Sequence, residues 1–343
     1  MKKVIRIIFL AGFLAAVWLA FDVIVFRHTP LNIDEGGLHY EIHAGETLTH
    51  LSRELYKANV IKHPRYLVLI GKIKGIANKI KTGEYLFESG IKPEQLLDQI
   101  TKGTTIQYSA TIVEGLNFRE VLAVLNQNEY LTHTLAGLNF AQIMEKLGKP
   151  GEHPEGRFLP DTYNFPRGTT DVEFLERAYQ AMDMLLAREW EQRQPDLPLK
   201  TPYDALILAS IVEKETAVSN ERKAIAGVFI RRLQKRMRLQ TDPTVIYGLG
   251  EKFDGNIRRR DLLADTPYNT YRHRGLPPTP IAMPSAEAIH AALNPGQGDA
   301  LYFVARGDGS HEFSATLEQH NKAVIKYQLK GRARPFSSMK KVK

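Results

Sequence analysis

The 343-residue sequence contains no cysteine. This absence excludes disulfide bonds, thiolate nucleophiles and cysteine-based metal sites. Neither His-Glu-x-x-His nor Gly-x-Ser-x-Gly occurs, so the zinc-protease and serine-hydrolase signatures are missing too. The eleven histidines are scattered, and no metal or cofactor site is predicted.

Charge of one sign prevails only weakly, with 46 Lys and Arg against 38 Asp and Glu. Part of the excess lies at the two ends of the chain, where it suits anionic lipid or an acidic polymer. No basic run is interleaved with aromatic residues, so nucleic acid is not an expected partner. The 43% hydrophobic content is typical of a folded globular protein.

A long hydrophobic run occurs at the N-terminus. Residues 7–26 are apolar apart from Asp22, and they follow Lys2, Lys3 and Arg6. About 20 such residues match the hydrocarbon core of a bilayer, and no small-x-small cleavage site follows Phe21, which favours an uncleaved anchor over a signal peptide. The positive-inside rule predicts a cytoplasmic N-terminus (1–6) and an exported remainder.

Residues 30–105 are predicted to form a small α+β module. A strand over 38–42, helices over 47–59 and 64–72, a strand near 80–87 and a helix from Pro93 fit the spacing of apolar residues. The order resembles LysM-like modules that contact peptidoglycan glycan, although a spacer without a ligand remains an equal alternative.

The stretch from Glu155 to Tyr163 is rich in turns and aromatic residues. Such a stretch is suited to lining a sugar groove, because aromatic faces pack on sugar rings. A packed surface loop explains the pattern equally well. A long amphipathic helix is predicted to follow over 171–193.

Residues 201–216 predict one buried helix that ends in two carboxylates. Thr201, Pro202 and Asp204 signal its start, and Glu215 continues the apolar stripe through Ile211 and Val212. A carboxyl on an apolar stripe is desolvated, which raises its pKa toward a value useful to a general acid. An ordinary charged helix end is the competing interpretation.

Polar, proline-containing stretches follow this helix. After a helix expected from Ser219 to about Met237, the segments 238–248 and 266–284 concentrate hydrogen-bonding side chains among prolines, which favours rigid loops. A hairpin is predicted near the end, with strands 301–305 and 311–314 joined by a turn at 307–309.

These motifs resemble the MltG (YceG-like) family of membrane-anchored endolytic murein transglycosylases. The matching segments are Ala209–Thr216, Leu239–Tyr247, Tyr268–Tyr271, Gly275–Pro278 and Leu159–Tyr163. The implied fold is α+β, with a transmembrane helix (7–26), the LysM-like module (30–105), a mixed α/β YceG-like catalytic region (106–335) and a basic tail (336–343).

The resemblance also implies a reaction and its site. Glu215 matches the family's catalytic glutamate, and cleavage between N-acetylmuramic acid and N-acetylglucosamine without water would leave 1,6-anhydro ends. We expect Gln240, Asp242, Asn269 and Tyr271 to orient the substrate or Glu215, and Glu213 to be structural.

The implied partners are peptidoglycan glycan strands and peptidoglycan synthases. The implied location is the inner membrane, with the catalytic region in the periplasm and a role in terminating nascent strands. Two other functions stay open: a muramidase that delivers water to the same intermediate, and a non-catalytic anchored scaffold that binds peptidoglycan.

Overall fold

The computed structural model describes residues 2–329 and divides into two compact units. The first contains the chain up to Tyr108 together with Asn164–Thr169, and the second contains Ser109–Tyr163 and the chain from Thr170 onward. The predicted basic tail, 336–343, lies outside the described residues.

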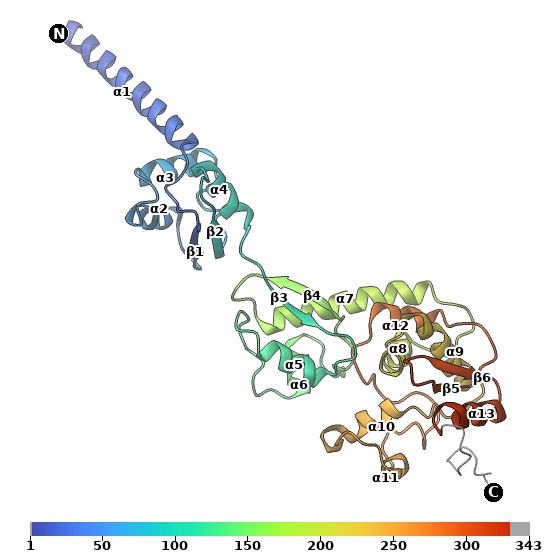
Figure 1. The fold of residues 1–343 in the computed structure, drawn as a ribbon. Helices are drawn as coiled ribbons and strands as arrows, with labels where there is room; N and C mark the ends of the chain where they lie inside the picture. Colours follow the sequence, from blue (N-terminus) through green and yellow to red (C-terminus); the bar gives the residue numbers. More distant parts are fainter. Residues whose placement is uncertain (1, 330–343) are drawn as a thin grey trace. The chain divides into compact units, whose positions relative to one another are not determined.

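The first unit begins with helix α1, Lys2–His28 (Figure 1). From Val4 to His28 it is long and apolar enough to cross a membrane, which is consistent with a single-pass anchor. All its described side chains up to Phe21 are exposed, whereas Val23 and Phe26 pack against the apolar core of the unit.

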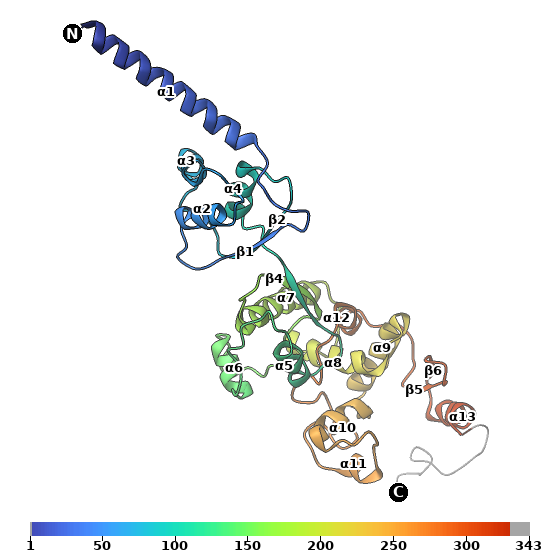
Figure 2. The ribbon, with the colours of Figure 1, turned by 60° about the vertical axis from the view of Figure 1, so that its left-hand side comes forward.

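The rest of the first unit is a mixed α/β module. Antiparallel strands β1 (Leu38–Ile42) and β2 (Gly83–Phe87) pair with Leu38 opposite Phe87. Helices α2 (Leu48–Lys57), α3 (Pro64–Ile73) and α4 (Pro93–Lys102) lie beside this pair of strands, as Figure 2 shows. The predicted strands and helices of this module are therefore confirmed to within a few residues.

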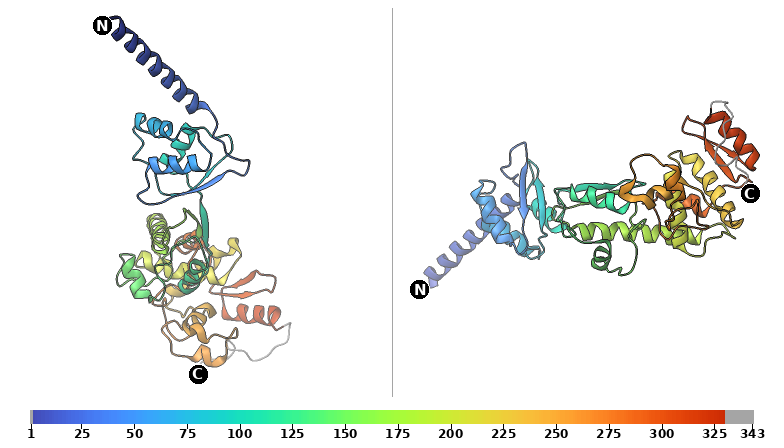
Figure 3. Two further views of the ribbon diagram at one scale, coloured as in Figure 1. Left: turned by 90° about the vertical axis from the view of Figure 1, so that its left-hand side faces the viewer. Right: turned by 90° about the horizontal axis from the view of Figure 1, so that it is seen from below.

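The described part of the second unit contains nine α-helices. Two small sheets accompany them, and the strands of one of these sheets begin or end in the first unit. The helices are α5 (Phe118–Asn126), α6 (Phe140–Lys146), α7 (Asp171–Glu191), α8 (Pro202–Glu215), α9 (Arg222–Gln234), α10 (Asp242–Leu249), α11 (Arg259–Leu263), α12 (Ala286–Leu293) and α13 (Leu317–Tyr327). The sheets are β3 (Tyr108–Ile112) with β4 (Asp161–Phe165), and β5 (Tyr302–Ala305) with β6 (His311–Ser314). Figure 3 shows α13 packed beside β5 and β6.

Helix α8 is the centre of the second unit. It contacts α12, α9, α7 and α10, and every residue from Ala205 to Val212 is buried. Thr201 and Asp204 form the predicted capping box, with Pro202 in the first turn. Because the helix is buried on all sides, the predicted apolar stripe does not by itself distinguish Glu215 from Glu213.

Two sequence expectations differ from the structure. The helix expected from Ser219 begins at Arg222, because Ser219 opens a short 3-10 turn and forms no side-chain cap. The polar segment after Gln240 contains helix α10, whose start is compatible with Pro243 since the first turn needs no N–H from that residue. The proline-rich segment is confirmed as loop from 264 to 285.

Candidate active site

Glu215 is the last residue of α8, where its side chain is only partly buried. Its carboxyl accepts a short hydrogen bond from the hydroxyl of Thr241. Burial raises the pKa of the Glu215 carboxyl above its ordinary value, and the Asp242 carboxylate adds to the rise, whereas the Thr241 hydrogen bond opposes it. The site thus presents a desolvated carboxyl whose raised pKa favours the neutral form.

Thr241 is held in place by the loop around Thr270. The Thr241 N–H donates to the Thr270 hydroxyl at 3.1 Å, and the Thr244 hydroxyl donates to the Thr241 carbonyl at 2.8 Å. The hydroxyls of Thr244 and Thr270 lie 2.9 Å apart. All three threonines are buried, so the hydroxyl that contacts Glu215 has a fixed position.

Glu213 meets different surroundings although it lies only two residues away. Its carboxylate accepts hydrogen bonds from the N–H (2.9 Å) and hydroxyl of Ser285, the N-cap residue of α12, and pairs with Arg222 of α9 at 3.4 Å. Its side chain is 7% exposed. Glu213 therefore joins three helices, which agrees with its expected structural role.

The four predicted neighbours of Glu215 divide into two groups. Gln240 and Asp242 are exposed and flank Thr241, and Tyr271 donates to Asp242 at 2.6 Å. Asn269 is fully buried. Its amide donates to the carbonyls of Asp261, Leu262 and Ala264, and its side-chain oxygen accepts from the Tyr271 N–H. Both polar atoms of the Asn269 side chain therefore form hydrogen bonds within the loop that carries Tyr271, and neither is left to bind a substrate.

Gln240 has a positive φ of 51°, which is uncommon for a residue other than glycine. Its N–H donates to the Thr270 carbonyl at 3.2 Å, which holds this turn against the same loop. In this turn, Gln240 and Asp242 come directly before and after Thr241, whose hydroxyl contacts Glu215.

Sequence reasoning singled out neither Thr241 nor Arg232. Arg232 of α9 is buried, donates to the carbonyls of Leu239 (2.6 Å) and Leu301 (2.7 Å), and its charge counters the rise of the Glu215 pKa. The sequence feature that could have pointed to Arg232 is its place on a helix face that otherwise packs in the core. Because Arg232 lies seventeen positions from Glu215, its effect on the Glu215 pKa could not be inferred from the sequence.

The stretch from Glu155 to Tyr163 is buried at Glu155, Gly156 and Phe158 and exposed at Asp161 and Thr162. Phe158 stacks on Phe118 with ring centroids 5.0 Å apart, and Glu155 accepts hydrogen bonds from the Phe118 N–H and the Tyr247 hydroxyl. Burial raises the pKa of Glu155 to about 7. Phe158 and Glu155 are therefore packed inside the unit, whereas the exposed end of the stretch leaves both interpretations open.

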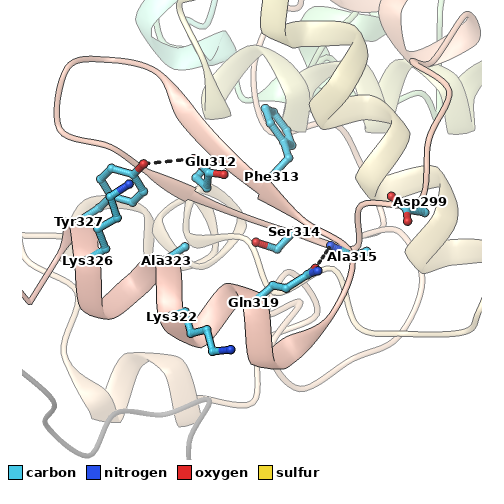
Figure 4. A pocket seen from close by; sticks show the side chains of 10 residues that line it. All are labelled: Asp299, Glu312, Phe313, Ser314, Ala315, Gln319, Lys322, Ala323, Lys326 and Tyr327. Atoms are coloured by element: carbon cyan, nitrogen blue, oxygen red, sulfur yellow. Dashed lines mark hydrogen bonds between the residues drawn. The ribbon is translucent and has the colours of Figure 1, made fainter. Parts of the chain in front are cut away.

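The hollow in Figure 4 lies between β6 and α13, with a volume of about 540 Å³. Phe313, Gln319 and Tyr327 are among its lining residues. Neither Glu215 nor its predicted neighbours line it, so it is separate from the candidate active site.

The comparisons with known proteins concern nearly the whole chain. The model of the YceG-like family matches residues 40–326. A Bacillus subtilis protein named endolytic murein transglycosylase is 31% identical over 303 residues, covering 83% of each chain. A Streptococcus pneumoniae protein of the same name is 28% identical, and the match covers 82% of this chain but 57% of that longer protein.

A solved structure also matches. The crystal structure of a putative yceG-like protein from Listeria monocytogenes aligns with a TM-score of 0.53 and 30% sequence identity, over 84% of this chain and 99% of that one. The fold, the matched range and the sequence identity together place this chain in the YceG-like family.

Proposed function

We propose that this chain is an endolytic murein transglycosylase, a lyase that cleaves peptidoglycan glycan strands internally, with Glu215 as its acid and base. The observation that carries the proposal is one desolvated carboxyl at the end of the central helix, oriented by a fixed hydroxyl. The names of the B. subtilis and S. pneumoniae relatives support the substrate class.

The chemistry needs a single carboxyl used twice. Neutral Glu215 protonates the glycosidic oxygen between N-acetylmuramic acid and N-acetylglucosamine while the C1–O bond breaks and C1 gains oxocarbenium character. The resulting carboxylate then removes the proton of the C6 hydroxyl, and O6 bonds to C1. Glu215 is neutral again, no water is consumed, and the product ends in a 1,6-anhydro sugar.

Neighbouring groups have supporting roles in this proposal. Thr241 orients the carboxyl, and Asp242, which disfavours ionisation of Glu215, is held by Tyr271. Gln240 and Asp242 are exposed and precede and follow Thr241 in the chain, so we assign both to contacts with sugar hydroxyls. Asn269 shapes the loop instead of binding the glycan.

The remaining parts of the proposal concern the rest of the chain. The order β1-α2-α3-β2 with antiparallel strands supports a LysM-like glycan-binding role for residues 30–105. The basic N-terminus and the apolar helix support a single-pass inner-membrane protein with its catalytic region, 106–335, in the periplasm. There it would act beside peptidoglycan synthases and terminate nascent strands.

Mass spectrometry of the product ends tests the reaction. The full-length chain in detergent is incubated with uncrosslinked glycan strands, and each fragment is sorted by its end group. Internal fragments one water lighter than reducing-end fragments are the expected products. Reducing ends would identify a muramidase on the same fold, and intact strands would favour a scaffold that only binds peptidoglycan.

A further inference from the structure

The junction between α1 and the first unit is rigid. The Arg27 guanidinium donates to both oxygens of Glu94 on α4, each at 2.6 Å, and Lys74 pairs with the same carboxylate at 2.6 Å. On the other side, the Tyr66 hydroxyl of α3 donates to Asp22 at 2.8 Å, and the rings of Phe26 and Tyr66 pack edge to face. The last two turns of α1 are thus part of the module.

This docking shortens the part of α1 that lipid can surround. The exposed stretch from Val4 to Phe21 has 18 residues, which at 1.5 Å per residue is roughly 27 Å long. A hydrocarbon core is about 30 Å thick. The bare helix is therefore no longer than the core, and the module begins where the core ends.

Helix α3 lies beside this end of α1 (Figure 3, left). Its exposed residues Arg65, Leu69, Lys72 and Ile73 follow helical spacing and share one face. Ile73 is 75% exposed and Leu69 39%. Among the described residues, Arg65 and Lys72 form no ion pair.

We infer that this face of α3 (Arg65, Leu69, Lys72 and Ile73) is a membrane-contact surface that lies in the headgroup region of the bilayer spanned by α1. Two apolar side chains that share a helix face with two unpaired cations are typical of a helix that lies in an anionic interface. Tyr66 adds an aromatic ring at the same level, where amphipathic rings are favoured.

The nearby acids do not oppose this contact. Glu94 is neutralised by Arg27 and Lys74, and Asp22 accepts the Tyr66 hydrogen bond. The inference rests on the proposed anchoring by α1 and is independent of the chemistry at Glu215. Its consequence is a fixed distance and orientation of the glycan-facing module relative to the bilayer.

Spin labels test the contact, since the chain has no cysteine to replace. Full-length Ile73→Cys, labelled and reconstituted in nanodiscs that contain anionic lipid, is compared with Glu41→Cys on β1 as the matched exposed control. Accessibility to oxygen, which partitions into lipid, and to a water-soluble nickel chelate gives the depth of each label. Unchanged thermal unfolding midpoints show that the labelled variants are folded.

We expect the oxygen-to-nickel ratio at residue 73 to be several-fold higher than at residue 41, and to fall when Arg65→Ala and Lys72→Ala are combined or when the lipid is zwitterionic. Equal, water-like ratios at both positions would overturn the inference. Low accessibility of residue 73 to both probes would overturn it as well, because a protein would then cover the face.

A third label, at Val17→Cys, distinguishes the membrane contact of α3 from the membrane anchoring by α1. A lipid-exposed residue 17 with a water-exposed residue 73 rejects only the α3 surface. A water-exposed residue 17 rejects the anchoring itself, and in either case the product ends formed by the enzyme are measured independently.

Discussion

The two sides of the end of α8 carry the same functional group in opposite settings. On one side, Glu213 is enclosed by Ser285 and Arg222, which together satisfy a carboxylate. On the other, Glu215 has one hydroxyl donor and lies near the Asp242 carboxylate. Desolvation and the nearby anion both raise the pKa of Glu215.

A third buried carboxyl shows why a raised pKa is not enough. The pKa of Glu155 is raised to about 7, yet its side chain is 2% exposed and is enclosed by Phe118 and Tyr247. A substrate cannot reach it. Glu215 is less buried than Glu155, and its pKa is raised as well.

The largest effect is expected for Glu215→Gln. The amide keeps the hydrogen bond from Thr241 but cannot transfer a proton, so kcat should fall roughly 10³-fold, the usual scale for a lost general acid and base. Release of anhydro-ended fragments measures it. A folded variant with wild-type turnover would remove Glu215 from the mechanism.

The next effect concerns stability and Glu155. Below the ordinary pKa of 4.5 both states are neutral, and as pH rises toward about 7 only the unfolded chain ionises, so folding loses stability. The loss should be about 3 kcal/mol between about pH 4 and about pH 8. Denaturant unfolding of Glu155→Gln should lack this component. An identical pH dependence in wild type and variant would contradict the assignment.

Glu213→Gln should affect stability more than turnover. It leaves the Arg222 guanidinium, 15% exposed, without its counter-charge, at a cost of about 1–3 kcal/mol. Turnover should stay within about tenfold of wild type because no proton transfer is lost. Thermal melts and product release at a temperature where both proteins are folded measure the two effects. A kinetic loss equal to that of Glu215→Gln would mean that the roles of the two acids are reversed.

The smallest effect is expected for Thr241→Val, which removes one hydroxyl at nearly constant volume. Without that donor the pKa of Glu215 rises further, so activity should persist to higher pH while kcat falls about tenfold through loss of orientation. A pH–rate profile reports both changes, and Thr241→Ser serves as the control. An alkaline limb that moves downward would contradict the role given to Thr241.

The sequence predicted the central helix and the hairpin of β5 and β6 because their signals are local. The capping box at Thr201 and the turn before His311 act within a few residues, and both are confirmed. The helices α6, α12 and α13 were not predicted, although Asn139, Ser285 and Thr316 cap them. In α6 and α12, with 7 and 8 residues, apolar periodicity has little room to appear.

The sequence singles out Glu215 through the family motif, but it does not reveal the groups that contact the two acids. Thr241 reaches Glu215 across 26 positions, and Ser285 reaches Glu213 across 72. Asn269 illustrates the converse, since a polar side chain in a polar motif turned out to serve the loop. Which polar groups face a ligand depends on tertiary contacts that no local pattern encodes.

Burial raises the pKa of the Glu215 carboxyl at the end of α8, and infrared difference titration measures this rise without relying on turnover. Spectra of the full-length wild type are compared with those of Glu215→Gln and Glu213→Gln as pH is raised from acid. Glu155, whose pKa is raised to about 7, contributes a protonated-carboxyl band to all three spectra. Beyond that contribution, we predict a protonated-carboxyl band above the ordinary titration range of glutamate in wild type and in Glu213→Gln that is absent from Glu215→Gln. Loss of this band in Glu213→Gln, with its retention in Glu215→Gln, would contradict the account.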